Sequence, residues 1–331
     1  MTYRMPAEWA LHDWLWIGFP GDPAEWPDAL PEAQRQVAAF ADAIHAGGRG
    51  EQVRLIARTP EDVDIARALV DPGVAVILEP FGDIWLRDTA PIAIRYGAER
   101  RLAGFGFNGW GGKFEMPGDE DIGRRLAERT DIPFESHPFI CEGGALDTDG
   151  TGLFVTTEQC LANPNRDNGL SPAQIETMLI GALGLGNMLW LGDGLVNDHT
   201  DGHVDNLARF VAPGVIAIPH ATTADDPNDL VYADAAARAL AFGLDVVRMP
   251  SVGTYLIDGQ IAPASYMNFF TGNAAVVVPQ YGAPNDAAAV EALRSFFPGR
   301  DVIGLPSDAL LRGGGSFHCC SQQMPSPEIQ P

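Results

Sequence analysis

Basic residues, cysteines and long apolar runs are all scarce in this sequence. The 21 lysines and arginines are outnumbered by 44 aspartates and glutamates, and the formal net charge is −23. A surface of this charge repels polyanions, so we expect neither nucleic acid nor an anionic membrane as a partner. Acidity often serves solubility alone, but it also favours small cationic ligands.

No stretch of the sequence is a candidate for a membrane span or a secretory signal. Roughly 20 consecutive apolar residues are needed to cross a bilayer, and no segment approaches that length. The N-terminal segment carries Glu8, His12 and Asp13 in place of the basic-then-apolar order of a signal peptide. We therefore expect a cytoplasmic protein.

The four cysteines do not form a disulfide framework. Cys141, Cys160, Cys319 and Cys320 lack the regular spacing of such proteins, which agrees with a reducing compartment. A bond between the adjacent Cys319 and Cys320 is not expected. At least one of these two thiols is therefore available for chemistry.

Strand-like and helix-like segments alternate along all 331 residues, a length that fits one large domain or two ordinary ones. No linker, charge block or biased tract divides the chain. A ββαβ-like rhythm recurs at roughly 60 to 70 residues, or about five times. We expect a single α/β domain over residues 1–331, whose strand order the pattern leaves open.

The expected elements follow from hydrophobic periodicity and capping signals. Ser171, Pro172 and Gln174 combine an N-cap, a first-turn proline and a capping-box glutamine, so a helix should begin there. A tight turn over 143–152 should lead into a strand at 153–157. Further helices are expected at 61–70, 119–129, 228–242 and 285–297, and strands at 53–57, 74–78, 188–191, 203–211, 215–219, 245–248, 266–270, 274–279 and 302–305.

Four polar clusters interrupt the apolar segments. They are Trp85-Leu-Arg-Asp88, Glu142-Gly-Gly144, His203-Val-Asp205-Asn206 and Gly313-Gly-Gly-Ser-Phe-His-Cys319-Cys320. The three glycines of the last cluster let backbone approach a ligand closely, and a cysteine after them could serve as a nucleophile. A glycine turn followed by an inert buried cysteine is the alternative.

His203 and Asp205 should lie on the same face of the expected strand, because strand side chains alternate. This arrangement suits an acid/base histidine beside a ligand-binding carboxylate, two metal ligands, or a structural pair. Asp88 and Glu142, each beside an abrupt turn, read individually as surface loops. Together, one thiol, one histidine and three carboxylates suit attack on a guanidinium, which needs carboxylates to accept its N–H groups, a soft nucleophile and a proton donor.

These clusters resemble the agmatine deiminases, also called the bacterial-type peptidylarginine deiminase family, within the guanidino-group-modifying (pentein) superfamily. The resemblance extends from Arg4-Met-Pro-Ala-Glu-Trp9 to Gln322-Gln-Met-Pro325. Between these ends it rests on Trp85-Leu-Arg-Asp-Thr-Ala-Pro91, Phe107-Asn-Gly-Trp-Gly-Gly112, Glu142-Gly-Gly144, Asn163-Pro-Asn-Arg166, Gly202-His-Val-Asp-Asn206 and Ala264-Ser-Tyr-Met-Asn-Phe269. It implies a five-bladed α/β propeller with a central site, a homo-oligomer, and a small cationic guanidino substrate, with no metal or organic cofactor.

The resemblance also implies a role for each site residue. Cys319 matches the nucleophile, His203 the acid/base, Asp88 and Asp205 the guanidinium-binding carboxylates, and Glu142 the carboxylate that steadies the site. Cys320 falls where the family usually has an apolar residue, so we interpret it as structural. The expected substrate-binding neighbours are Trp85, His199, Asn268, Gly314 and Gly315. Because the carboxylates should raise the pKa of the thiol in the empty enzyme, we expect the bound cation to assist its ionisation.

One position departs from the family pattern. His199 stands where the resemblance implies a carboxylate for the amine end of agmatine, and Asp198 or Asp201 could compensate. Histidine suits a carboxylate or a neutral polar group better than an ammonium. Agmatine, converted to N-carbamoylputrescine for polyamine synthesis, is the favoured substrate, and an arginine derivative or peptidyl arginine is the alternative.

Three other classes of protein compete with this interpretation. A zinc protein could use His203, Asp205, His318 and Cys319, although the spacing is uncommon and thiolates are few. A cysteine protease or transglutaminase would not need two further carboxylates at the nucleophile. A non-catalytic binding propeller would not need the complete set of chemical groups.

Overall fold

Four small sheets of the computed structural model, which describes residues 3–166 and 169–327, share one strand order. In each, a central strand pairs antiparallel with the strand before it and parallel with the strand after it. They are β4 (Ile92–Tyr96), β5 (Glu99–Gly106) and β6 (Phe134–Ile140); β7 (Asp147–Thr148), β8 (Leu153–Thr157) and β9 (Asn187–Leu191); β10 (Arg209–Ala212), β11 (Val215–His220) and β12 (Asp245–Pro250); and β15 (Phe270–Thr271), β16 (Ala275–Gln280) and β17 (Asp301–Pro306).

A fifth sheet unites segments from the two halves of the chain. Strand β1 (His12–Gly18) pairs antiparallel with β18 (Ser321–Pro325) and parallel with β2 (Gln52–Ala57), which pairs parallel with β3 (Ala75–Leu78). This sheet repeats the order of the other four, except that its antiparallel strand comes from the C-terminal segment and that β3 adds a second parallel neighbour. Beside the five sheets lies a two-stranded hairpin, β13 (Leu256–Ile257) and β14 (Gln260–Ile261).

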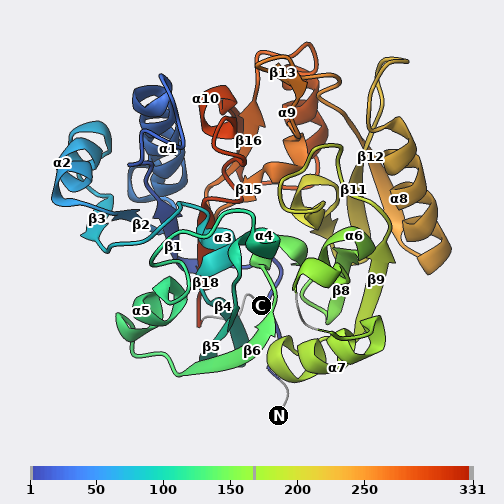
Figure 1. The fold of residues 1–331 in the computed structure, drawn as a ribbon, viewed down its shortest axis with the longest axis horizontal. Helices are drawn as coiled ribbons and strands as arrows, with labels where there is room; N and C mark the ends of the chain where they lie inside the picture. The colour runs from blue at the N-terminus through green and yellow to red at the C-terminus, as the bar shows by residue number, and fades with distance from the viewer. Residues whose placement is uncertain (1–2, 167–168, 328–331) are drawn as a thin grey trace.

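Each parallel pair is joined through a helix, because parallel neighbours need a long crossover. The crossover helices are α1 (Leu30–His45), α2 (Pro60–Leu69), α5 (Ile122–Glu128), α7 (Pro172–Leu183), α8 (Asp229–Phe242) and α9 (Asp286–Arg294). They lie toward the outside of the molecule, whereas the short helix α3 (Leu86–Thr89) lies near its middle (Figure 1). The fold is thus mixed α/β, as expected.

Helix α1 illustrates how this packing is encoded. Val37, Phe40 and Ile44, at helical spacing, are fully buried in the core shared with β1 and β2. Their periodicity places one apolar stripe against the sheet. No helix within the described ranges is long and apolar enough to span a membrane.

Most predicted elements are confirmed to within a few residues. The helix expected at Ser171 is α7, and its capping box forms, with the Ser171 backbone N–H donating to Gln174 Oε1 at 2.9 Å. The predicted helices correspond to α2, α5, α8 and α9, and the predicted strands to β2, β3, β8, β9, β11, β12, β16 and β17.

Two predicted strands are wrong in their first halves. Residues 204–206 form the 3₁₀ turn η4 (Val204–Asn206), which His203 precedes, and residues 266–268 form η5 (Tyr266–Asn268). Buried side-chain hydrogen bonds replace a strand ladder there, since Asn268 Nδ2 donates to Asn206 Oδ1 at 3.0 Å. The expectation that His203 and Asp205 project from one face of a strand is therefore corrected.

Candidate active site

The candidate site residues share one position in the repeating unit, just before the strand that pairs antiparallel in each sheet. Short turns or single-turn helices at these points carry Asp88 before β4, Glu142 before β7, His203 and Asp205 before β10, Asn268 before β15, and Cys319 before β18. Each sheet thus contributes to one group of side chains. The position of each candidate residue just before a strand is visible in the sequence, but the motifs considered one at a time do not reveal it.

Cys319 lies at the wall of a cavity of about 130 Å³ and is 6% exposed. Asn268 Nδ2 lies 2.9 Å from its Sγ, and the Asn268 Oδ1 atom accepts the backbone N–H of Cys319 at 3.2 Å. Its thiol also contacts Asp205 Oδ2 at 3.5 Å. Burial first, and then the charges of Asp205 and Asp88, hold the pKa of the Cys319 thiol well above its ordinary value. The thiol is therefore protonated when no cation is bound.

The Cys320 side chain lies outside the candidate reaction site. It is fully buried, and its thiol donates to the Phe317 carbonyl at 3.5 Å. It does not line the cavity, and it packs in the core that contains α1. This environment agrees with its interpretation as a structural residue.

The Asp88 carboxylate is fixed by two neutral donors. Trp110 Nε1 donates to Oδ2 at 2.9 Å, and the Gly144 backbone N–H donates to Oδ1 at 2.8 Å. Burial, followed by the charges of Asp205 and Glu142, raises the pKa of Asp88 well above its ordinary value. Trp110 was not predicted as a site residue, although it lies inside a motif that carried the family resemblance.

The Asp205 carboxylate has a histidine neighbour instead. Its Oδ2 lies 2.8 Å from His318 Nδ1, whereas its Oδ1 has no hydrogen-bond partner among the described residues. Burial alone would raise the pKa of Asp205, but the hydrogen bond and charge of His318 outweigh it and lower the pKa. Asp205 is therefore ionised in the empty site.

His203 is fully buried close to both carboxylates. Its Nδ1 lies 3.8 Å from Asp88 Oδ2, and neither ring nitrogen makes a hydrogen bond within the described part of the chain. Burial lowers its pKa to about 3, so the ring is neutral. Gly144 makes this meeting of groups feasible, because a Cβ there would lie 2.5 Å from His203 Nδ1 and 2.9 Å from Asp88 Oδ1.

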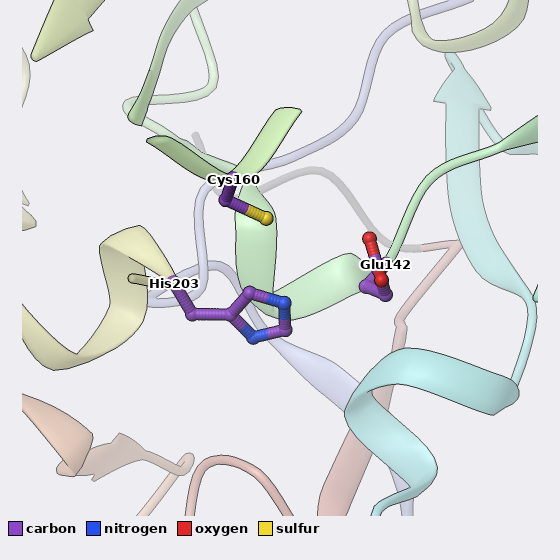
Figure 2. A group of neighbouring side chains, drawn as sticks. All are labelled: Glu142, Cys160 and His203. Atoms are coloured by element: carbon purple, nitrogen blue, oxygen red, sulfur yellow. The ribbon is translucent and has the colours of Figure 1, made fainter. Parts of the chain in front are cut away.

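Glu142 faces His203 and a second thiol, that of Cys160 (Figure 2). The ligand atoms of these three buried residues lie within 4.8 Å of one another, a separation that could suit a metal ion. However, Arg166 Nε lies 2.6 Å from Glu142 Oε1, and Arg166 Nη2 donates to Cys160 Sγ at 3.5 Å. The guanidinium already neutralises Glu142 and would repel a divalent cation, so these residues do not fit a metal site.

The cavity wall contains six of the ten predicted site residues. The other four (His203, Asp205, Glu142 and Asn268) are buried behind it, in contact with the nucleophile or close to the Asp88 charge. The six are Trp85, Asp88, His199, Gly314, Gly315 and Cys319.

Two of the three glycines that line the cavity are required by space and conformation. Gly314 has a φ of +114°, in the region that favours glycine. A Cβ on Gly315 would lie 2.7 Å from the Trp85 ring and 2.9 Å from the Cys319 Cβ. Glycine at both positions lets the backbone pass close to the nucleophile.

The outer part of the cavity differs from the expectation. Asp198 and Asp201 do not line it, because Asp198 accepts hydrogen bonds from Thr200 and Asn206 while Asp201 pairs with Lys113 and Arg166. The hypothesis that one of them replaces the missing carboxylate is therefore wrong for this structure. Residues that line the wall but were not predicted are Glu25, Asp83, Trp110, Phe114, Thr200, Arg312 and Gly313.

Comparison with known proteins places this geometry in a family. Agmatine deiminases of Stutzerimonas stutzeri and Pseudomonas aeruginosa are each 35% identical to the chain, covering 99% and 98% of it and 97% and 96% of the relatives. The solved agmatine deiminase of Enterococcus faecalis superposes with a TM-score of 0.91 at 29% identity, covering 99% of this chain and 97% of that one. An agmatine deiminase of C. jejuni with substrate bound superposes equally well, at 28% identity and with 98% and 97% covered.

More distant likeness is confined to the fold. An amidinotransferase of Microseira wollei superposes with a TM-score of 0.60 at 14% identity, covering 99% of this chain and 98% of that one. The family model for Porphyromonas-type peptidyl-arginine deiminase, in contrast, matches residues 4–325, which include all the site residues described above. The chain therefore belongs to the Porphyromonas-type peptidyl-arginine deiminase family.

Proposed function

We propose that the protein hydrolyses agmatine to N-carbamoylputrescine and ammonia, with Cys319 as nucleophile. One observation carries the proposal: a buried thiol at a cavity wall touches one carboxylate, and a second carboxylate and a neutral histidine lie beside them. The relatives with 35% identity over nearly the whole chain are named agmatine deiminases, which supports the same substrate.

The guanidinium binds between Asp88 and Asp205 in this mechanism. A planar cation with five N–H donors needs two such acceptors, and Asp205 Oδ1 is available to accept from it. Binding fixes the guanidinium carbon near Cys319 and brings a positive charge to the site. That charge stabilises the thiolate, and the thiol proton passes to the neutral His203.

Two chemical steps follow. The thiolate adds to the guanidinium carbon, the imidazolium of His203 gives its proton to one terminal nitrogen, and ammonia leaves. The resulting S-alkylthiouronium is attacked by water as His203 removes a water proton. The C–S bond then breaks, which releases the ureido product and restores the cysteine for the next cycle.

The outer cavity favours a substrate with an ammonium tail. Glu25 and Asp83 line the wall, and burial followed by the charge of Glu25 raises the pKa of Asp83 well above its ordinary value. An incoming cation would relieve this repulsion. Trp85, Trp110 and Phe114 on the same wall would pack against the four-carbon chain of agmatine.

A second candidate substrate is an arginine derivative with a negative or neutral tail. Arg312 and the exposed His199 also line the cavity, and both suit a carboxylate. Arg312 is 42% exposed, however, and already lies 3.6 Å from Asp258. This partial neutralisation favours agmatine over an anionic tail.

The wider expectations also belong to this proposal. We infer that the five sheets form the blades of one five-bladed propeller, in a single domain over residues 1–331, with the site where the blades converge. A homo-oligomer in the cytoplasm and a place in polyamine synthesis complete the hypothesis. A non-catalytic propeller is the alternative if no guanidine reacts.

A substrate panel tests the proposal. Purified protein is incubated with agmatine, free arginine, 4-guanidinobutyrate, an N-acylated arginine and an arginyl peptide, while ammonia and ureido product are measured together. We expect turnover of agmatine, abolished by Cys319→Ala and retained by the matched control Cys320→Ala. Turnover of 4-guanidinobutyrate alone would support hydrolysis of a guanidinium but contradict agmatine as the substrate. No turnover of any compound would contradict the enzymatic function.

A further inference from the structure

A buried histidine joins the N-terminal segment to the guanidinium-binding carboxylate. His318 Nε2 lies 2.9 Å from Glu8 Oε2, and His318 Nδ1 lies 2.8 Å from Asp205 Oδ2. All three side chains are at least 94% buried. Glu8 belongs to the loop before β1, so this contact links segments at opposite ends of the chain.

The two carboxylates that face the histidine ring are both ionised. Burial would raise the pKa of Glu8, but Arg209 and His318 outweigh it and hold the pKa well below the ordinary value. The pKa of Asp205 is likewise lowered. Each ring nitrogen of His318 therefore faces an ionised carboxylate oxygen, at 2.9 Å on the Glu8 side and 2.8 Å on the Asp205 side.

Glu8 is anchored independently of His318. Its Oε1 accepts the Thr271 backbone N–H at 2.9 Å, and its Oε2 lies 2.9 Å from Arg209 Nη2 and 3.6 Å from Arg87 Nη2. Two arginines therefore face the ring from the same side as Glu8. Without the Glu8 anion, the charges of both arginines would face the His318 ring unbalanced.

The Glu8–His318 contact can affect substrate binding through Asp205. His318 occupies Oδ2, which leaves Oδ1 without a hydrogen-bond partner among the described residues and ready to accept an N–H group. The other ionisable groups that act on Asp205 or Glu8 are His203, Cys319, Asp88, Arg87, Arg209, Asp147, Asp198 and Arg300. His318 lies within 3 Å of both carboxylates, one on each side of its ring.

We propose that Glu8 and His318 act as a positioning pair, which keeps Asp205 ionised and turns one of its oxygens toward the guanidinium. Neither residue touches the substrate or lines the cavity in this scheme. The inference rests on the proposed function, in that it assigns the guanidinium to Asp205. It adds a specific purpose for the glutamate of the N-terminal motif and for the histidine beside the nucleophile.

The test compares two buried glutamate–histidine pairs. Glu51 Oε1 lies 2.9 Å from His12 Nδ1, both side chains are fully buried, and Glu51 Oε2 accepts the Asn273 backbone N–H at 2.8 Å. This pair does not line the cavity. Glu51→Gln is therefore a matched control for Glu8→Gln, and His318→Gln tests the same contact from the other side.

Binding of agmatine is measured by calorimetry on a Cys319→Ala background, where turnover is absent, and KM, kcat and pH profiles are measured on the Cys319 background. We expect Glu8→Gln and His318→Gln each to weaken binding roughly 10- to 100-fold, with a larger change in KM than in kcat. Both changes break the contact chain from Glu8 through His318 to Asp205. Since His318 lowers the pKa of Asp205, that pKa should rise, and the acid limb of kcat/KM should move to higher pH. The double variant should be no worse than the worse single variant, because the two residues act as a unit.

Three outcomes would overturn the positioning role. These are affinities and pH profiles equal to those of Glu51→Gln, additive losses in the double variant, and failure of both single variants to fold while Glu51→Gln folds. The proposed function fails separately: the protein with Cys319 intact would then release no ammonia, while the calorimetry would still report on Glu8 and His318.

Discussion

Asp88 and Asp205 place the same side chain in two contrasting environments. Asp88 accepts hydrogen bonds from an indole and a backbone amide, both neutral, and its pKa is raised. Asp205 is bonded to a histidine that is itself bonded to a glutamate, and its pKa is lowered. Two neighbouring carboxylates are more easily kept ionised when one of them has a partner that stabilises its charge. The difference suggests that Asp205 is the permanent anion of the site and that Asp88 becomes fully ionised when the substrate arrives.

The largest expected effect comes from removing the permanent anion. Asp205→Asn should lower kcat/KM roughly a thousandfold, because it removes both the anion that binds the guanidinium and the carboxylate that His318 contacts. Asp88→Asn should cost less, roughly ten- to a hundredfold, because the amide oxygen can still accept from Trp110. Steady-state assays of both variants with agmatine measure the difference, and equal losses would contradict the asymmetry.

The second prediction concerns the thiol between the two carboxylates. Burial, Asp205 and Asp88 raise the pKa of Cys319 in the empty site, so a bound cation should lower it. A pH series of alkylation rates, with and without a non-reactive guanidinium ligand, should show a drop of at least about one unit, or tenfold in thiolate. The Cys319→Ala protein reports background alkylation of the other thiols. An unchanged thiol pKa would mean that the substrate does not assist ionisation.

A smaller effect is expected at the neutral partner of Asp88. Trp110→Phe keeps the aromatic wall but removes the donor that lies 2.9 Å from Asp88 Oδ2. The loss of one hydrogen bond to a carboxylate should reduce kcat/KM roughly tenfold. Trp190→Phe is the control, since its indole donates to Glu176 away from the cavity. If Trp110→Phe behaves like that control, the donor has no part in holding Asp88.

The smallest effect should appear at the mouth of the cavity. Glu25 is half-buried, so Glu25→Gln should raise KM for agmatine only about threefold, the scale of a partly screened charge pair. KM for N-butylguanidine, which has no ammonium tail, should stay the same. An equal rise for both compounds would assign Glu25 a general role in the wall and not in tail recognition.

Elements stabilised by neighbouring residues could be predicted from the sequence, whereas turns stabilised by distant residues could not. The capping box of α7 and the buried strands β11 and β16 depend on neighbouring residues, and local patterns predicted them. The turn at 204–206 depends on Asn268 and Asp198, which bond Asn206 from other segments, so an apolar–polar alternation was mistaken for a strand. The candidate catalytic residues all came from motifs of the family, and Asn268, predicted only as a substrate-binding neighbour, contacts the nucleophile.

Side chains that meet only through the fold were harder to predict. Glu8 was visible in an N-terminal motif, but its contact with His318 requires β1 and β18 to pair. Asp83 and Glu25 reach the cavity wall from two separate loops, and no spacing in the sequence connects them. Asp198 and Asp201 were predicted to bind the substrate tail because they are close to His199 in sequence. In the folded loop, neither of them lines the cavity.

The pairing of β1 with β18 has a consequence for the order in which activity arises during synthesis. Until β18 docks, β1 presents an open edge, and Cys319, immediately before β18, has neither Asp205 nor Asn268 beside it. Pairing of segments so far apart in sequence is intrinsically slow. A nascent or partly folded chain therefore carries an ordinary thiol, and the reactive one exists only once the final strand has closed the first sheet.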